Sequence, residues 1–217
     1  TGGTLDTSSR AGYNVHTFTS PGTLTVSSGV NDVEYLVIAG GGSGGNCPSP
    51  PSFVSAGGGG AGGFISTTTI IGPGRYTITV GGAGSNSSIA GPPLFTTITS
   101  TRGGLGGSPF SRSGGPGGSG GGGANPGGSP GSGNTPTIPV ALGGPQGNSG
   151  GPSAAPFASD SSGGGGGAGS VGGVGTNDAG GVGGAGKTAF NGDTGLPSVY
   201  GMPGPTGGRW FAGGGGG

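Results

Sequence analysis

The sequence has few of the side chains that catalysis and metal binding require. Its 217 residues include one Cys, one His, one Trp and one Met, and only 6% of residues are charged. A single cysteine, Cys47, excludes an internal disulfide and offers no thiolate cluster for zinc. One His and a few scattered acidic residues supply no combination of general acid, base and nucleophile. The composition therefore predicts a protein that is not an enzyme and holds neither a metal nor a cofactor.

Net charge and long apolar runs are also missing. Six Lys and Arg balance six Asp and Glu, and no basic stripe indicates a nucleic-acid-binding surface. No stretch reaches the roughly 18 apolar residues of a membrane-spanning helix, and residues 1–20 lack the regions of a signal peptide. The chain does not begin with Met and stops within a glycine run, as expected of a piece of a longer protein. We expect no nucleic-acid partner and no membrane insertion.

Glycine dominates what is present. It fills 68 positions, many of them in runs such as 57–60, 120–123 and 163–167. Because glycine has no Cβ, extended segments can lie close enough to satisfy their N–H and C=O groups with one another. The sequence keeps no continuous Gly-X-Y register, which excludes collagen. The glycine runs therefore predict a bundle of polyglycine-II helices, joined at its two ends by short loops such as 108–112 and 135–142.

The first hundred residues carry a different pattern, with β-branched and aromatic residues close together. Residues 13–19 and 24–26 flank Pro21-Gly22, a pair suited to a type II turn, and predict a β-hairpin. The apolar run 33–39 predicts a buried strand that leads directly into glycine. Further strands are expected at 63–68, 76–80 and 94–99, with a turn at Gly72-Pro73-Gly74 between the first two. No helical period is present.

The predicted fold is therefore an all-β N-terminal sheet of five or six strands combined with a glycine-rich polyglycine-II helix bundle, without an α-helix. We expect a β-rich region with glycine-rich excursions at 1–102 and a polyglycine-II-like region at 103–217. The excursions of the first region could join the second, so that the two form one intergrown domain.

Three formal motifs lack the context that their chemistry needs. Residues 181–188 match a P-loop, but neither a buried strand before them nor a helix after them is expected. Residues 41–45 match a nucleophile elbow, but His16 precedes the serine and belongs to a predicted strand. Residues 172–178 form one imperfect copy of a calcium-binding repeat that must be stacked to work. Each match is a by-product of glycine density.

The order of these features resembles the glycine-rich domain of bacteriophage tail fibres and tail-fibre adhesins. The resemblance lies in the predicted hairpin, the strand 33–39, the runs 40–45 and 57–63, and the segment 76–84; residues 208–214 are similar to a recurring segment of those domains. It implies stacked polyglycine-II helices with host-recognition loops at one tip. It also implies a non-enzymatic virion or extracellular protein that attaches to a host-cell glycan or outer-membrane protein and self-associates as a trimer or filament.

Two other functions remain open, a self-assembling extracellular filament or matrix subunit and an ice-binding protein. The second would need a regular row of Thr or Ala on one face, which the irregular patches do not favour. Trp210 and Phe211 are expected to pack against the bundle. The candidate surface-contact residues are those that lie in patches between glycine runs and carry large side chains: Phe110, Arg112, Phe157, Tyr200 and Met202.

Overall fold

The computed structural model describes residues 1–47, 55–154, 161–176, 179–190, 196, 200–205 and 208–217. These residues contain short strands, one 3-10 turn (η1, Val140–Leu142) and no α-helix, which confirms the expected all-β class. The strands are β1 (Thr4–Asp6), β2 (Val15–Thr17), β3 (Gly22–Val26), β4 (Asn31–Ile38), β5 (Phe64–Ile71), β6 (Gly74–Thr79), β7 (Ser87–Ala90), β8 (Ile98–Ser100), β9 (Lys187–Thr188), β10 (Met202–Pro203) and β11 (Arg209–Phe211).

Two antiparallel sheets enclose the hydrophobic core. Strand β4 pairs with β5 along its whole length, and a second sheet has the order β3-β6-β7-β8. Alternate side chains of each strand point inward, and one core cluster joins Tyr35 and Val37 of β4 and Ile65 of β5 to Ile98 of β8. Burial in this cluster raises the pKa of Tyr35 above its ordinary value. The two sheets therefore pack face to face as a small sandwich.

The predicted hairpin between 13–19 and 24–26 is wrong. Strand β2 pairs with β1, and β3 pairs with β6 in the four-stranded sheet. A type II turn at Pro21-Gly22 would need a positive φ at Gly22, but Gly22 is the first residue of β3 and has no such φ. The Phe18 ring packs against Gly22 instead, and the chain passes from one sheet to another there.

The other predicted strands are confirmed in part. The runs at 33–39, 63–68 and 76–80 correspond to β4, β5 and β6, and Gly72-Pro73 joins β5 to β6. The strand expected at 94–99 is only the short β8, because residues 92–95 form a turn closed by a Phe95 N–H to Pro92 C=O hydrogen bond. Strand β7 was not expected, since its Ser-Ser-Ile-Ala sequence carries little β signal.

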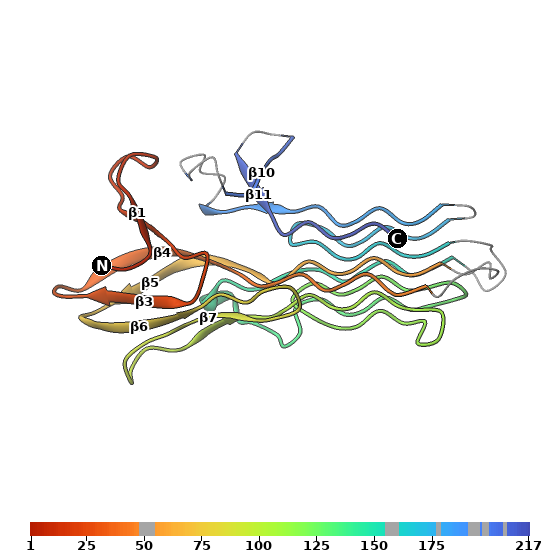
Figure 1. The fold of residues 1–217 in the computed structure, drawn as a ribbon, viewed down its shortest axis with the longest axis horizontal. Coiled ribbons are helices and arrows are strands. Elements are labelled where there is room, and N and C mark those ends of the chain that lie inside the picture. Colours follow the sequence, from red (N-terminus) through yellow and green to blue (C-terminus); the bar gives the residue numbers. More distant parts are fainter. Residues whose placement is uncertain (48–54, 155–160, 177–178, 191–195, 197–199, 206–207) are drawn as a thin grey trace.

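The glycine-rich stretches form extended segments that lie side by side along the long axis of the molecule (Figure 1). We call them together the glycine array. Successive segments run in alternating directions, so the chain turns at an end beside the sheets and at an opposite, distal end. Within the described residues, the array consists of segments 39–45, 57–63, 101–107, 112–118, 119–124, 128–134, 146–153, 161–167, 170–175, 180–186 and 212–217. Its hydrogen bonds cross the predicted boundary at residue 102.

Segment 119–124 lies at the centre of the array and shows how its backbone is satisfied. Its N–H groups donate in rotation to three neighbouring segments, so that every third residue meets the same neighbour: 119 and 122 bond to 57–63, 120 and 123 to 146–153, and 121 and 124 to 112–118, at 2.7–3.1 Å. Its C=O groups accept in the same rotation from 101–107, 161–167 and 128–134. One segment thus exchanges hydrogen bonds with six others.

Glycine is required in this segment by close approach of neighbouring backbone. A Cβ atom built on Gly122 would lie 1.9 Å from the carbonyl oxygen of Gly163, and one on Gly121 would lie 1.9 Å from that of Leu105. No side chain fits at these distances. The backbone hydrogen bonds of the array therefore depend on the absence of side chains at its inward positions.

The β1–β2 arm is attached to the body through Arg10. The Arg10 guanidinium lies 3.8 Å from the ring centroid of Tyr13 and 4.9 Å from that of Phe190, and it forms an ion pair with Glu34. At the base of the same loop, hydrogen bonds from Ser9 and Ser8 hold the pKa of Asp6 well below its ordinary range. Arg10 therefore connects β4 and Phe190 to a loop that has its own internal hydrogen bonds.

We expect Arg10→Ala to release this arm without unfolding the body. Loss of the two cation–π contacts and the ion pair should cost about 1–2 kcal/mol locally. Hydrogen exchange of the β1 and β2 amides should accelerate, while the β4 and β5 amides stay protected. Arg75→Ala, on the exposed face of β6, is the matched control. Unchanged exchange in the arm of the Arg10 variant would show that backbone pairing alone holds it.

Candidate functional site

Two of the predicted contact residues, Phe110 and Arg112, lie at the distal end of the glycine array. Segment 101–107 runs antiparallel to 57–63 and away from the sheets, so the turn 108–113 that follows it is distal. The Phe110 side chain is 86% exposed, and Arg112 is exposed with a φ of 50°. The Ser108 C=O accepts from the Arg112 N–H at 2.6 Å, which closes the turn. The distal end thus presents an aromatic ring and a guanidinium on a closed turn.

The other candidates do not join them. Met202 lies in β10, beside the sheets, and is 71% exposed. Tyr200 is half-buried, and its carbonyl accepts a hydrogen bond from the Arg209 side chain. Phe157 lies outside the described residues. The four described candidates are therefore divided between opposite ends of the array and form no single site.

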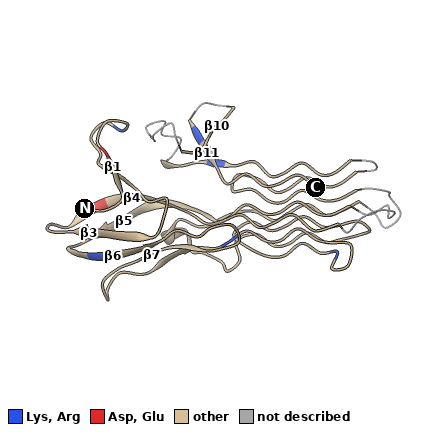
Figure 2. Cartoon of the chain, viewed as in Figure 1, with Lys and Arg blue, Asp and Glu red and all other residues tan. Residues whose placement is uncertain are grey.

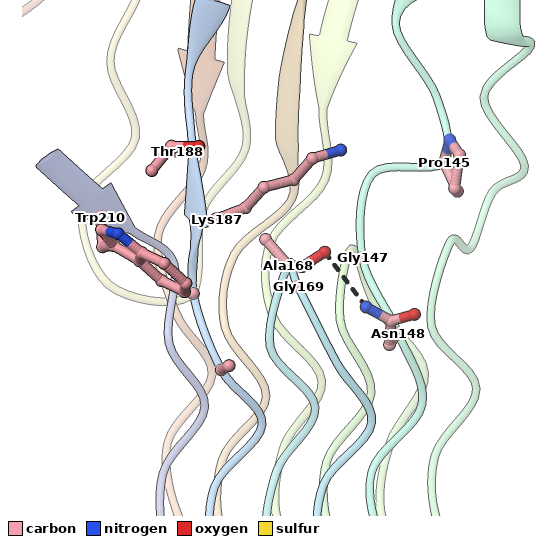
Figure 3. Close-up of a pocket in the computed structure, with 10 residues that line it drawn as sticks. Pro145, Gly147, Asn148, Ala168, Gly169, Lys187, Thr188 and Trp210 are labelled. Carbon is pink, nitrogen blue, oxygen red and sulfur yellow. Dashed lines mark hydrogen bonds between the residues drawn. The ribbon is translucent and has the colours of Figure 1, made fainter. Parts of the chain in front are cut away.

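Sequence reasoning missed a groove beside β9 and β11. It has a volume of about 360 Å³ and is lined by residues from four parts of the chain, among them Asn148, Ala168, Lys187, Thr188 and Trp210. Figure 3 shows Trp210 on one side of the groove and Asn148 on the other, with Lys187 extending from β9 between them. Trp210, which was expected to pack against the bundle, thus also lines a groove.

Both walls of the groove are held by defined contacts. Trp210 of β11 is in register with Thr188 of β9 on one side and Met202 of β10 on the other. The backbone of Gly204 packs on the pyrrole part of the indole, so closely that a Cβ there would lie 1.9 Å from Cδ1. On the opposite wall, the Asn148 Nδ2 group donates to the carbonyls of Gly167 and Ala168 at 2.9 and 3.1 Å.

The groove carries one positive charge. The Lys187 ammonium lies 5.8 Å from the ring centroid of Phe64, and no Asp or Glu of the described residues forms an ion pair with it. None of the groove-lining residues is acidic. Figure 2 shows that charged residues are sparse along the rest of the array, where the sequence places only Arg102 and Arg112. Lys187 is therefore a distinct electrostatic feature of this surface.

Two of the formal motifs have structures that do not suit their chemistry, and the calcium-repeat match at 172–178 ends in residues 177–178, which lie outside the described residues. Residues 181–186 of the P-loop match belong to the glycine array, and the amides of Gly181 and Gly184 donate to the carbonyls of Ser162 and Gly165. His16 lies in β2, as expected, and its Nδ1 is 2.7 Å from the Gly2 carbonyl oxygen. In the described part of the chain, no three metal-binding side chains come together, and no helix is long and apolar enough to cross a membrane.

A small β-sandwich continued by backbone-bonded glycine segments places the chain in the class of glycine-rich, all-β domains. The chain belongs to the glycine-rich domain family, whose model matches residues 17–217. No curated protein sequence and no solved structure matches the chain significantly. The family assignment agrees with the glycine-rich part of the resemblance found in the sequence.

Proposed function

We propose that this chain is a non-enzymatic structural and adhesive component of a bacteriophage tail fibre. In this proposal a rigid glycine-rich scaffold presents loops to a receptor on the host-cell surface. The supporting observation is the alternating direction of the glycine segments, which collects turns at the two ends of the array. Surface loops on a rigid scaffold are the usual place for binding residues. The exposed turn 108–113 would then be a contact surface.

The proposal includes a specific backbone conformation, in which the glycine segments are polyglycine-II helices. A helix with three residues per turn directs every third N–H toward the same neighbour, and segment 119–124 donates in that rotation. In a crystal structure we expect φ and ψ of residues 119–124 near about −75° and +145°. Values near about −120° and +115°, typical of parallel β-strands, would contradict this part of the proposal.

If the distal turn attaches to the host, substitutions in this turn should weaken cell binding, whereas substitutions at the opposite end should not. We expect fluorescently labelled Phe110→Ala/Arg112→Ala protein to bind host cells at least about tenfold more weakly, because an aromatic ring and an arginine are typical of residues that dominate binding energy. Leu94→Ala, fully exposed in the turn 92–95 at the opposite end, is the matched control. Flow cytometry with cells sensitive to the parent particle measures the effect. Full binding by the double variant would remove the distal turn from the proposal.

The location of the chain tests the broader claim. Immunoelectron microscopy of the native particle should place antibody label on a tail fibre, at its tip or along its shaft. A long homopolymer that carries label without an attached particle would contradict the tail-fibre proposal. It would instead support the second candidate function, a self-assembling extracellular filament or matrix subunit.

One observation favours that second candidate. Val171 and Val174 of segment 170–175 are exposed, and so is Val182 of segment 180–186. The Gly173 N–H donates to the Val182 carbonyl, so the three valines lie on neighbouring segments. Exposed apolar patches of this kind mark protein contact sites. Lateral association of copies would cover them.

A further inference from the structure

We infer that the groove between Trp210 and Asn148 is a binding site for a pyranose that carries a carboxylate, such as a uronic acid at the end of a surface glycan. This inference rests on the proposed attachment function and names a receptor chemistry for it. It concerns the end of the array beside the sheets, whereas the turn 108–113 lies at the distal end. The site would therefore provide a second contact with the host surface.

The side chains of the groove have the chemistry that a sugar ring requires. An indole offers a broad apolar face for the C–H groups of a pyranose. Thr188 adds a hydroxyl to the lining of the groove. The volume of about 360 Å³ lies at the small end of the usual range for ligand pockets, about 300–1,000 Å³. This size suits one or two sugar residues.

The walls are positioned before any ligand arrives. Packing of the Gly204 backbone against the indole fixes one wall, and the two hydrogen bonds from Asn148 Nδ2 fix the other. These bonds occupy both amide hydrogens of Asn148, so that its carboxamide oxygen is the group with acceptor capacity left. A ligand that binds between fixed walls does not have to order them, which favours affinity.

Lys187 favours an acidic sugar over a neutral one. Its side chain extends toward the side of the groove where Pro145 and Asn148 lie (Figure 3). No Asp or Glu of the described residues forms an ion pair with its ammonium, and the lining residues are not acidic. A hydrogen bond between an ammonium and a carboxylate is about twice as strong as one between neutral groups. The charge of the groove thus complements a uronate.

A nucleotide phosphate is a poorer match, although Lys187 also belongs to the formal P-loop sequence. Phosphate binding by such a loop needs several backbone N–H groups that converge on the anion. Here the amides of Gly181 and Gly184 are bonded to the neighbouring segment 161–167. Thr188 is in β9 and paired with Trp210, so it does not begin a helix. The sequence therefore lacks the following helix, and two of its amides are already bonded within the array.

The inference is tested by NMR titration of the ¹⁵N-labelled chain with sodium glucuronate and with glucose, at equal ionic strength. We expect shifts at the Trp210 indole N–H and at the Ala168 and Lys187 amides, with millimolar affinity for glucuronate. Glucose should bind at least about tenfold more weakly, because it cannot pair with the ammonium. Shifts that avoid the groove, or equal affinity for the two sugars, would overturn the inference.

Two variants distinguish the contribution of the Lys187 charge to sugar binding from that of the shape of the groove. Lys187→Gln should reduce the affinity for glucuronate to that for glucose, whereas Ala185→Phe should block both sugars while leaving Trp210 in place. Ala185 lines the groove and is exposed, so a larger side chain should not disturb folding. Phe110→Ala, at the distal end, should bind as the unchanged chain does. Normal glucuronate affinity in both groove variants would also overturn the inference.

These outcomes are distinct from those that test the proposed function. Suppose that glucuronate binds in the groove but immunoelectron microscopy finds the chain in a homopolymer without an attached particle. This result would retain the sugar site and remove the tail-fibre role. Cell attachment that Lys187→Gln and Ala185→Phe leave unchanged, together with no glucuronate binding, would retain attachment and remove the sugar site.

Discussion

Gly122→Ala should remove a large part of the stability of the fold. The added methyl would lie 1.9 Å from the Gly163 carbonyl oxygen and 2.5 Å from its carbon, both of them backbone atoms held inside the array. To make room, segment 161–167 must move, which breaks hydrogen bonds such as Gly163 N–H to Gly123 C=O and Gly58 N–H to Gly163 C=O. We expect a loss of more than about 4 kcal/mol, a large part of the stability of a typical domain. Thermal unfolding followed by circular dichroism and one-dimensional NMR measures it.

The matched control is Gly44→Ala, in an outer segment of the same array. Gly44 is exposed, and a Cβ there would meet only the Gly57 carbonyl oxygen, at 3.7 Å. Its φ is not in the left-handed region, so alanine should change the free energy of unfolding by no more than about 0.5–1 kcal/mol, with a small gain expected from the less flexible unfolded chain. Equal effects of the two substitutions would show that close backbone approach does not decide which positions must be glycine.

The sequence predicts local conformation well where side chains carry a signal. The run 33–39 has a continuous series of large apolar residues and forms β4, whose Tyr35 and Val37 are buried. The sequence does not predict which strands pair, because the partners are far apart in the chain. Strand β4 pairs with β5 across a long glycine excursion, and β3 pairs with β6. The hairpin prediction failed because a local turn signal was used to assign a pairing that distant residues determine.

In the glycine runs, the sequence predicts even less about which segments become neighbours. Segments 57–63, 119–124 and 161–167 are nearly indistinguishable in composition, yet each bonds to a particular set of neighbours. Side chains do not encode this arrangement within the runs. The arrangement depends instead on where the loops end and on polar residues at the ends of segments. One of these is Asn148, whose Nδ2 group donates to the carbonyls of Gly167 and Ala168. The neighbours of each segment could therefore not be predicted from the sequence.

The candidate site was predictable to a similar degree. The patches 108–112 and 135–142 were expected to be loops, and the structure places the first at the distal end and the second beside the sheets. The groove was not expected, because Asn148, Lys187 and Trp210 are far apart in sequence and only the glycine array brings their segments together. The strongest available signal was a single Trp next to Arg209 in a chain with few aromatic residues.

At the junction of the sheets and the glycine array, Gln146→Leu should lower the free energy of unfolding more than a substitution of any other polar residue. Gln146 is fully buried. Its Oε1 accepts from the Thr101 N–H at 2.8 Å, and its Nε2 donates to the Pro136 carbonyl at 2.8 Å. Leucine has a similar size but leaves these two backbone groups unpaired. An unpaired group that water does not reach costs about 1–3 kcal/mol. Because Thr101 is half-buried and Pro136 is exposed, water can bond to the freed Pro136 carbonyl, and the Thr101 N–H should account for most of a loss of about 1–3 kcal/mol in urea unfolding.

The physical reason is that Gln146 replaces the backbone pairing that neither sheet nor array supplies at this point. Its own carbonyl accepts from the Phe64 N–H, where segment 57–63 becomes β5. Thr101→Val is the matched control, because it removes only the hydroxyl at 3.3 Å from Nε2 and should cost at most about 1 kcal/mol. A Gln146→Leu variant as stable as this control would mean that water or a backbone shift satisfies the freed groups. A large difference between them would show that one buried carboxamide joins the two halves of the fold.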